Sequence, residues 1–204
     1  MQKIVALSCA ALVAATAAAA PGIPRGFLLS ERAAATKDAD PQTNWKVSDS
    51  LKTRFALDPC GRNAPGRTGR VAARTVTFTG VPDFMKVEQV LLYGSQAGAA
   101  RAVSQVRAAL SACGSRKDGG SAYRYAATAV AGLGDEALKV SGQIYYGAKA
   151  GVGGDRTVLV RRGNAVLVYL RAGEYSRPVG RDWADQLRDA TRMTAKICGI
   201  ATCS

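Results

Sequence analysis

The stretch TVLVRRGNAVLVYL, residues 157–170, decides the fold class of this chain. Two runs of β-branched and aliphatic residues flank Gly163 and Asn164, which together suit the two-residue turn of a β-hairpin. The predicted cross-strand pairs are Arg162 with Ala165, Val160 with Leu167, Val158 with Tyr169, Leu159 with Val168 and Thr157 with Leu170. Because apolar side chains alternate onto both faces, we expect this hairpin at the centre of a sheet that is covered on both sides.

Segments rich in β-branched and aromatic residues predict further strands on both sides of the hairpin. The six predicted strands are residues 70–79, 87–93, 123–130, 138–146, 156–162 and 165–171. Short connections between the later strands indicate mostly antiparallel pairing. Residues 45–55 are predicted as a short helix, and residues 115–121 and 147–155 as loops.

Two amphipathic helices complete the predicted fold. Ala99, Val103 and Val106 recur at helical spacing, and Ser95 precedes them as a candidate N-cap. A second helix is predicted over residues 182–197, with acidic residues in its first turn. The fold class is therefore α+β: a mostly antiparallel sheet of about six strands flanked by helices and stapled by disulfides.

The first residues have the pattern of a secretory signal peptide. Lys3 gives the positive start, residues 4–15 are apolar, and residues 17–19 are small residues suited to cleavage. A membrane anchor or a lipoprotein cysteine at Cys9 fits less well, because the apolar run is short and Ala-rich. The predicted division is a signal peptide (1–19), a lead-in and linker (20–44) and a main domain (45–204). We expect a secreted protein, extracellular or associated with the cell envelope, with no transmembrane span.

Four cysteines remain once the leader is removed: Cys60, Cys113, Cys198 and Cys203. An even number in an exported chain predicts two disulfides. Three pairings are open; we favour Cys60 with Cys113 and Cys198 with Cys203, because both loops can close without demanding a particular topology. Zinc is disfavoured because the spacing lacks two close cysteine pairs, so we predict neither a metal nor a cofactor.

The sequence contains no histidine. A Ser-His-Asp triad, a Cys-His pair and a His-ligated metal are therefore excluded. Asp135 and Glu136 are the best carboxylate pair, but adjacent side chains diverge and the surrounding glycines favour a turn. Ser95 lies at a predicted strand-to-helix turn without a nucleophile motif, so it is interpreted as a cap. We predict a non-enzymatic protein, and a carboxylate-dependent envelope hydrolase is a weaker alternative.

Tyrosines cluster in the second half of the chain together with arginines. Amphipathic rings beside a cation suit a cleft for lipid or glycan head groups, although packing in the core and at its rim explains the same pattern. The candidate ligand-binding residues are Tyr123, Tyr125, Tyr145, Tyr146, Arg124 and Arg171. Strand alternation places Tyr123 and Tyr125 on one face, and Tyr145 and Tyr146 on opposite faces.

The formal charge of +13, from 28 Lys and Arg against 15 Asp and Glu, makes this a basic protein. Outside the cell such a charge favours polyanionic surfaces. The arginines are scattered without a run of five or six, however, which is typical of a solubilising surface. Weak polyanion binding, or a protein-inhibitor role, is therefore the alternative to ligand binding.

Several short motifs carry a family resemblance over residues 45–200. They are Leu57-Asp58-Pro59-Cys60, Val90 to Tyr93 leading into Ala99 and Ala100, Leu110 to Cys113, Gly134-Asp135-Glu136-Ala137 and the turn Val158 to Asn164. In these the chain resembles the exported sensor-type domains of actinobacteria, the family that includes the extracellular domain of the receptor kinase PknH. The resemblance implies an antiparallel sheet flanked by helices, two disulfides, a cleft for an unidentified ligand and no catalytic residues.

The sequence departs from the receptor form because it carries neither a kinase domain nor a membrane span. The resemblance therefore implies a free, sensor-like binding module. We expect a monomer whose partner is a small molecule, a lipid or another envelope component.

Overall fold

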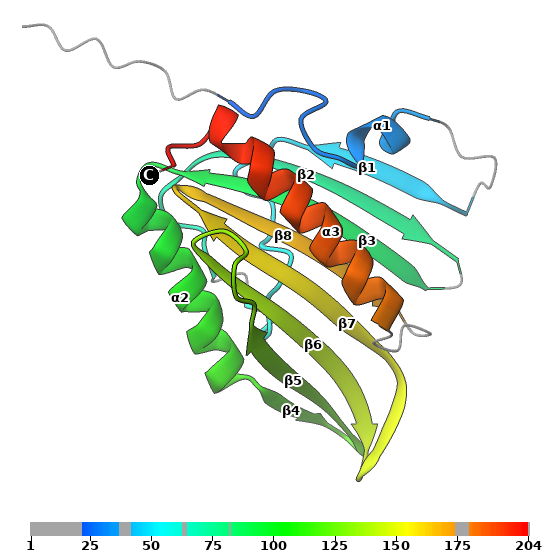
Figure 1. Ribbon diagram of the computed structural model, residues 1–204. Coiled ribbons are helices and arrows are strands. Elements are labelled where there is room, and N and C mark those ends of the chain that lie inside the picture. The colour runs from blue at the N-terminus through cyan, green and yellow to red at the C-terminus, as the bar shows by residue number, and fades with distance from the viewer. Residues whose placement is uncertain (1–21, 37–41, 63–64, 82, 174–179, 204) are drawn as a thin grey trace, which may run out of the picture.

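The hairpin predicted at residues 157–170 lies at the centre of the sheet in the computed structural model, which describes residues 22–36, 42–62, 65–81, 83–173 and 180–203 (Figure 1). Strand β7 (Lys149–Arg162) pairs antiparallel with β8 (Ala165–Gly173). The register confirms all five predicted cross-strand pairs, including Val160 opposite Leu167. Gly163 has φ +56°, the left-handed conformation that this tight turn requires.

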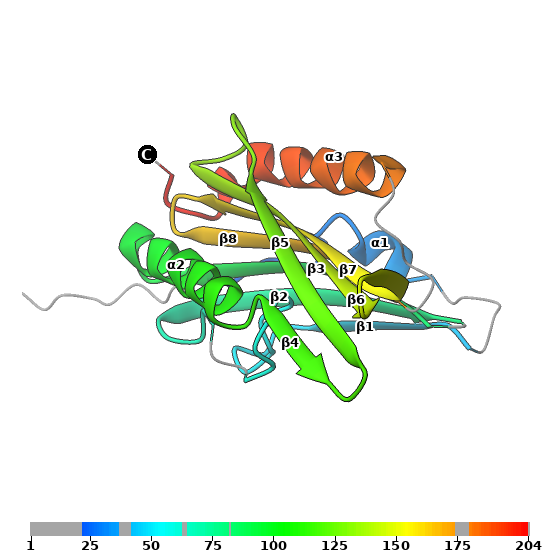
Figure 2. The ribbon, with the colours of Figure 1, turned by 90° about the horizontal axis from the view of Figure 1, so that it is seen from below.

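The sheet has eight strands in the order β1-β2-β3-β8-β7-β6-β5-β4, and each neighbouring pair is antiparallel. The remaining strands are β1 (Asn44–Ser48), β2 (Arg70–Gly80), β3 (Phe84–Tyr93), β4 (Ser115–Asp118), β5 (Ser121–Ala129) and β6 (Glu136–Tyr146). The helices are α1 (Glu31–Ala34), α2 (Gln96–Ala112) and α3 (Gly180–Lys196), which continues into the 3-10 turn η1 (Ile197–Gly199). Figure 2 shows β4 and β5 crossing the line of the other strands at a steep angle, so the sheet is strongly twisted.

Each face of the sheet has its own hydrophobic core. On one face Val158 and Leu167 pack beneath α3, which contributes the fully buried Met193. On the other face Leu159 and Val168 pack with α2. The prediction that the central hairpin is covered on both sides is therefore confirmed.

The expected number of about six strands is wrong, because two edge strands, β1 and β4, were not predicted. Residues 45–55, predicted as a helix, begin in β1, where the Trp45 ring packs 4.7 Å from that of Phe78. Residues 115–118 are too polar to show alternation, yet they pair with β5. Both segments are strands because they pair with a neighbouring strand, and not because of their local sequence preference.

The glycine-rich residues 147–155, predicted as a loop, belong mostly to β7. Glycine is needed here because strands β6 and β7 approach closely. A Cβ at Gly154 would collide with the carbonyl oxygen of Gly142 on the neighbouring strand. The glycines that suggested a loop therefore mark a place where two strand backbones pack closely.

Helix α2 and both disulfides agree with the predictions. Ser95 Oγ accepts the N–H of Gly98 at 3.1 Å, so this serine is an N-cap. The predicted stripe Ala99, Val103 and Val106 is buried. The disulfides join Cys60 to Cys113 and Cys198 to Cys203, which is the favoured pairing.

The segment 22–36 packs against the α3 side of the sheet. Ile23 and Leu28 are buried in that core. Glu88 on β3 accepts the N–H groups of Leu29 and Ser30 at 2.9 and 2.7 Å. The predicted signal peptide, residues 1–19, lies outside the described residues. In the described part of the chain, no helix combines the length and the hydrophobicity needed to cross a bilayer.

Candidate functional site

Two adjoining recesses lie on the sheet face that carries α2. The first, of about 430 Å³, lies between residues 53–58 and the strands β2, β3 and β8. The second, of about 470 Å³, lies toward the turn between β2 and β3. Both are lined by Met85 and Ala172, so we treat them as one elongated depression and call it the groove.

One wall of the groove is the irregular segment 53–58, which buried contacts fix in place. Gln89 is fully buried, and its amide oxygen accepts the N–H of Ala56 at 3.0 Å. Its amide nitrogen donates to the carbonyl oxygen of Arg54 at 2.9 Å and to Thr75 Oγ1 at 3.0 Å. The neighbouring Cys60 is bonded to the end of α2. The wall is therefore held from both the sheet and the helix.

The floor of the groove is mostly apolar, with a polar corner. The strands contribute the side chains of Met85, Val87, Leu170 and Ala172 to it. Asp155 lies at the corner and is only 8% exposed. A depression with this lining suits an apolar ligand that is oriented by a few polar contacts.

Two of the predicted tyrosines form the polar corner with Asp155. The rings of Tyr123 and Tyr125 lie 5.0 Å apart on the same face of β5, as alternation predicted. The Tyr123 hydroxyl donates to Asp155 Oδ2 at 2.7 Å, whereas Asp155 Oδ1 is buried without a hydrogen-bond partner. A Cβ at Gly142 would lie 2.5 Å from the Tyr123 ring, so this contact requires a glycine on the strand between them.

Burial dominates the acid-base properties of this corner. It raises the pKa of the Asp155 carboxyl, and the hydrogen bond from Tyr123 only partly opposes the shift. Burial, followed by the proximity of Asp155, raises the pKa of both Tyr123 and Tyr125. Both phenols therefore stay protonated at neutral pH, and the Tyr123 hydroxyl donates its hydrogen to Asp155.

The structure places the other four predicted ligand-binding residues away from the groove. The Arg124 guanidinium stacks over the Tyr145 ring at 4.6 Å. Tyr146 is 60% exposed at the end of β6. Arg171 forms ion pairs with Asp182 at 2.8 Å and Asp185 at 3.5 Å on α3.

The carboxylate pair weighed for catalysis has structural partners instead. Asp135 accepts the N–H of Gly163 at 2.7 Å and pairs with Arg161 and Arg162 at 3.0 and 2.8 Å. Glu136 pairs with Arg107 at 2.8 Å. The Asp135 contacts brace the β7–β8 turn, in agreement with the interpretation of this loop as a turn, and the Glu136 ion pair joins β6 to α2.

Sequence reasoning missed Asp155, Gln89 and the wall segment 53–58. Asp155 stood in a glycine-rich stretch that was interpreted as a loop. The alternation of the central hairpin, extended backward from Leu159 through Thr157, places Asp155 on the α2 face and could have found it. The wall segment has no periodic signal, because hydrogen bonds to a distant strand position it.

The sequence matches no known protein family, and no curated protein matches it significantly. A comparison of folds, in contrast, finds the crystal structure of the extracellular domain of PknH from Mycobacterium tuberculosis, with a TM-score of 0.53. The fold is similar to that of the PknH extracellular domain. The match covers 84% of this chain and 94% of that domain at 12% sequence identity. The sensor-type resemblance seen in the sequence is thus confirmed as a likeness of fold.

Proposed function

We propose that this chain is an exported, sensor-like module that binds an elongated and largely apolar small molecule or lipid in the groove without transforming it. The observation that carries the proposal is the groove itself. It joins two recesses of about 430 and 470 Å³ along an apolar floor, and the buried carboxyl of Asp155 lies beside Ala172, which lines both recesses. Each recess alone has the volume of a small-ligand site.

The polar corner suggests how a ligand would be oriented. Tyr125 and Asp155 both line the first recess, beside the apolar side chains of Val87 and Leu170. A ligand with a hydroxyl or amine at one end and an apolar body would match this arrangement. A purely hydrocarbon ligand would leave the corner without a polar partner, which is costly in a buried site.

Export and the absence of turnover are parts of the same proposal. Two disulfides and a fold shared with an extracellular domain support an oxidising location, as does the predicted signal peptide. The sequence has no histidine, and Asp135 and Glu136 form ion pairs with arginines. Both observations support binding rather than catalysis.

Titration calorimetry with dodecanol and butanol tests the proposal, because dodecanol can span both recesses and butanol cannot. We expect saturable binding of dodecanol and no measurable binding of butanol. Ala172→Trp would fill the junction of the two recesses and abolish dodecanol binding. Ala126→Trp, on an exposed site of β5, is the matched control and should bind as the wild type does.

Equal binding by both tryptophan variants would place the alcohol outside the groove and overturn the proposal. So would the absence of dodecanol binding to the wild type.

A further inference from the structure

Two hairpin ends lie side by side at one extremity of the sheet, beyond the ends of α2 and α3 (Figure 1). They are the β4–β5 turn and the β6–β7 turn, and the pairing of Ser121 with Tyr146 joins them. We call residues 115–124 and 145–152 the tip. The C-terminus lies at the opposite extremity of the molecule.

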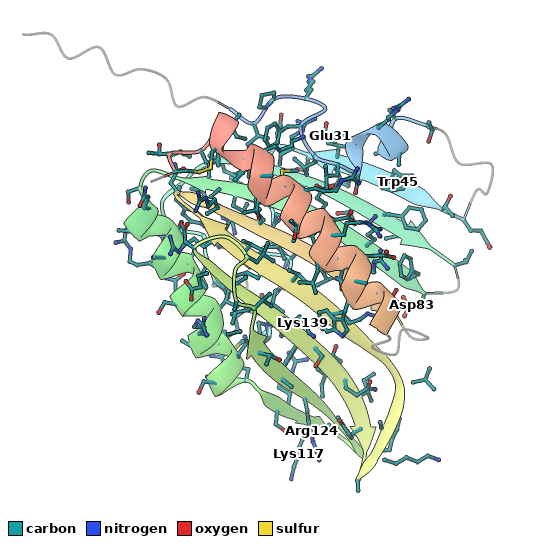
Figure 3. All side chains as sticks on the ribbon, viewed as in Figure 1. Glu31, Trp45, Asp83, Lys117, Arg124 and Lys139 are labelled. Atoms are coloured by element: carbon teal, nitrogen blue, oxygen red, sulfur yellow. A yellow bond between two sulfur atoms is a disulfide. The ribbon has the colours of Figure 1, made fainter. Side chains whose placement is uncertain are left out.

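The tip has an excess of positive charge. It contains four cations, Arg116, Lys117, Arg124 and Lys149, and one acid, Asp118. Lys117, Arg124 and Lys149 are all exposed, and in the described part of the chain none of the three forms an ion pair. Figure 3 shows Lys117 and Arg124 at this end of the sheet.

Many arginines elsewhere are neutralised by acids. Arg74 pairs with Glu31 at 2.6 Å, and Arg161 and Arg162 pair with Asp135 at 3.0 and 2.8 Å. The unpaired cations of the tip therefore contribute more to the external field of the molecule than these arginines do.

Apolar and aromatic groups lie on the same two hairpin ends. Strand pairing places Tyr145 on one face of the sheet with Lys117 and Arg124, and Tyr146 on the other face with Lys149. Tyr146 is 60% exposed and Val152 is 45% exposed. The guanidinium carbon of Arg124 lies over the Tyr145 ring, 4.6 Å from the ring centroid. The tip thus presents exposed apolar side chains and unpaired cations at one extremity of the molecule, and these two components together attach a peripheral protein to a membrane.

We propose that the tip contacts an anionic phospholipid surface. The cations face the lipid phosphates, and Tyr146 and Val152 enter the interfacial region, where tyrosine is favoured. A dissolved polyanion would account for the cations but would gain nothing from the exposed apolar side chains. The segment 45–52 also exposes apolar residues, yet it combines two lysines with one aspartate and has a charge of only +1, against +3 for the tip.

Co-sedimentation with phospholipid vesicles tests this contact. We expect the full chain without its leader to bind vesicles containing phosphatidylglycerol, and not vesicles of phosphatidylcholine alone. Binding should be lost at about 0.5 M salt, where screening acts within a few ångströms. Replacing Lys117, Arg124 and Lys149 together by alanine should weaken binding about 100-fold, since each cation contributes about fivefold.

Two further variants separate the components. The change Tyr146→Ser with Val152→Ser should weaken binding about tenfold, without altering the charge. The matched control replaces Lys46, Lys52 and Arg101 by alanine; it removes the same charge from other elements and should change binding less than about threefold. The thermal transition of each variant verifies folding.

The proposal is overturned if the wild type does not sediment with phosphatidylglycerol vesicles, or if the control variant loses as much binding as the tip variant. Binding to soluble dextran sulfate without binding to vesicles would assign the tip to a dissolved polyanion, and would overturn it as well.

Discussion

The hydroxyl of Tyr123 reaches Oδ2 of Asp155 at 2.7 Å from two strands away in the sheet. The strand between them carries Gly142, where any Cβ would strike both partners. This contact closes the polar corner of the groove and leaves Asp155 Oδ1 buried without a hydrogen-bond partner. The corner is thus built at the expense of local stability, as is common at binding sites.

Tyr123→Phe should destabilise the fold by about 1–3 kcal/mol, because Asp155 would lose its donor while remaining buried. Urea unfolding of the purified protein measures this loss. Tyr145→Phe is the matched control on the neighbouring strand, and it should change the free energy of unfolding by less than about 0.5 kcal/mol. A neutral Tyr123→Phe variant would show that the hydrogen bond contributes nothing.

Asp155→Asn should raise the melting temperature at pH 7 and leave it unchanged near pH 3. Burial raises the pKa of Asp155 in the folded state, so the ionised carboxyl opposes folding. This penalty is absent when the carboxyl is protonated in both states, and it develops as pH rises through the unfolded and then the folded pKa. Calorimetry across this pH range checks the sign; a variant less stable than the wild type at pH 7 would contradict it.

Glu31→Gln should cost about 2 kcal/mol at pH 7, because Glu31 accepts two hydrogen bonds from the buried Arg74 at 2.7 and 2.6 Å. Burial raises the pKa of Glu31, but the bonds from Arg74 and from the N–H groups of Gly26 and Leu28 outweigh burial and lower it to about 2. The stabilisation should therefore be complete above pH 4.5 and be lost as pH falls toward 2.

The difference in unfolding free energy between wild type and Glu31→Gln, measured from pH 2 to pH 7, tests this dependence. A difference that does not change with pH would contradict the role of the ionised carboxylate. Proteolysis of residues 22–36 should become faster in the variant, since this pair anchors the segment to β2.

The two disulfides should contribute unequally. Replacing Cys60 and Cys113 by serine should cost about 4 kcal/mol, because the bond closes a separation of 53 residues. Replacing Cys198 and Cys203, which are five residues apart, should cost about 2 kcal/mol. Urea unfolding of the two double variants gives the ranking. Equal losses would indicate that strain or residual structure outweighs chain entropy.

The central hairpin was predictable to the residue, because its apolar alternation and its turn residues point to one register. Helix α2 was equally predictable, since Ser95 caps a continuous apolar stripe. The edge strand β4 was not, because its four residues are polar and adopt a strand only when β5 pairs with them.

The candidate site was predictable only in part. Alternation correctly placed Tyr123 and Tyr125 on one face, but nothing in the sequence linked them to Asp155 across Gly142. Arg171 was predicted to line a ligand cleft, and its ion pair with Asp182 depends on how α3 lies on the sheet. Contacts between distant elements have no local signature in one sequence.

Native mass spectrometry of the protein purified from the organism that produces it tests the central claim most directly. We predict a bound small molecule or lipid on the wild type and on Ala126→Trp, and the bare polypeptide mass for Ala172→Trp. A wild type that carries nothing, or an adduct that persists on Ala172→Trp, would contradict the assignment of the groove as the binding site.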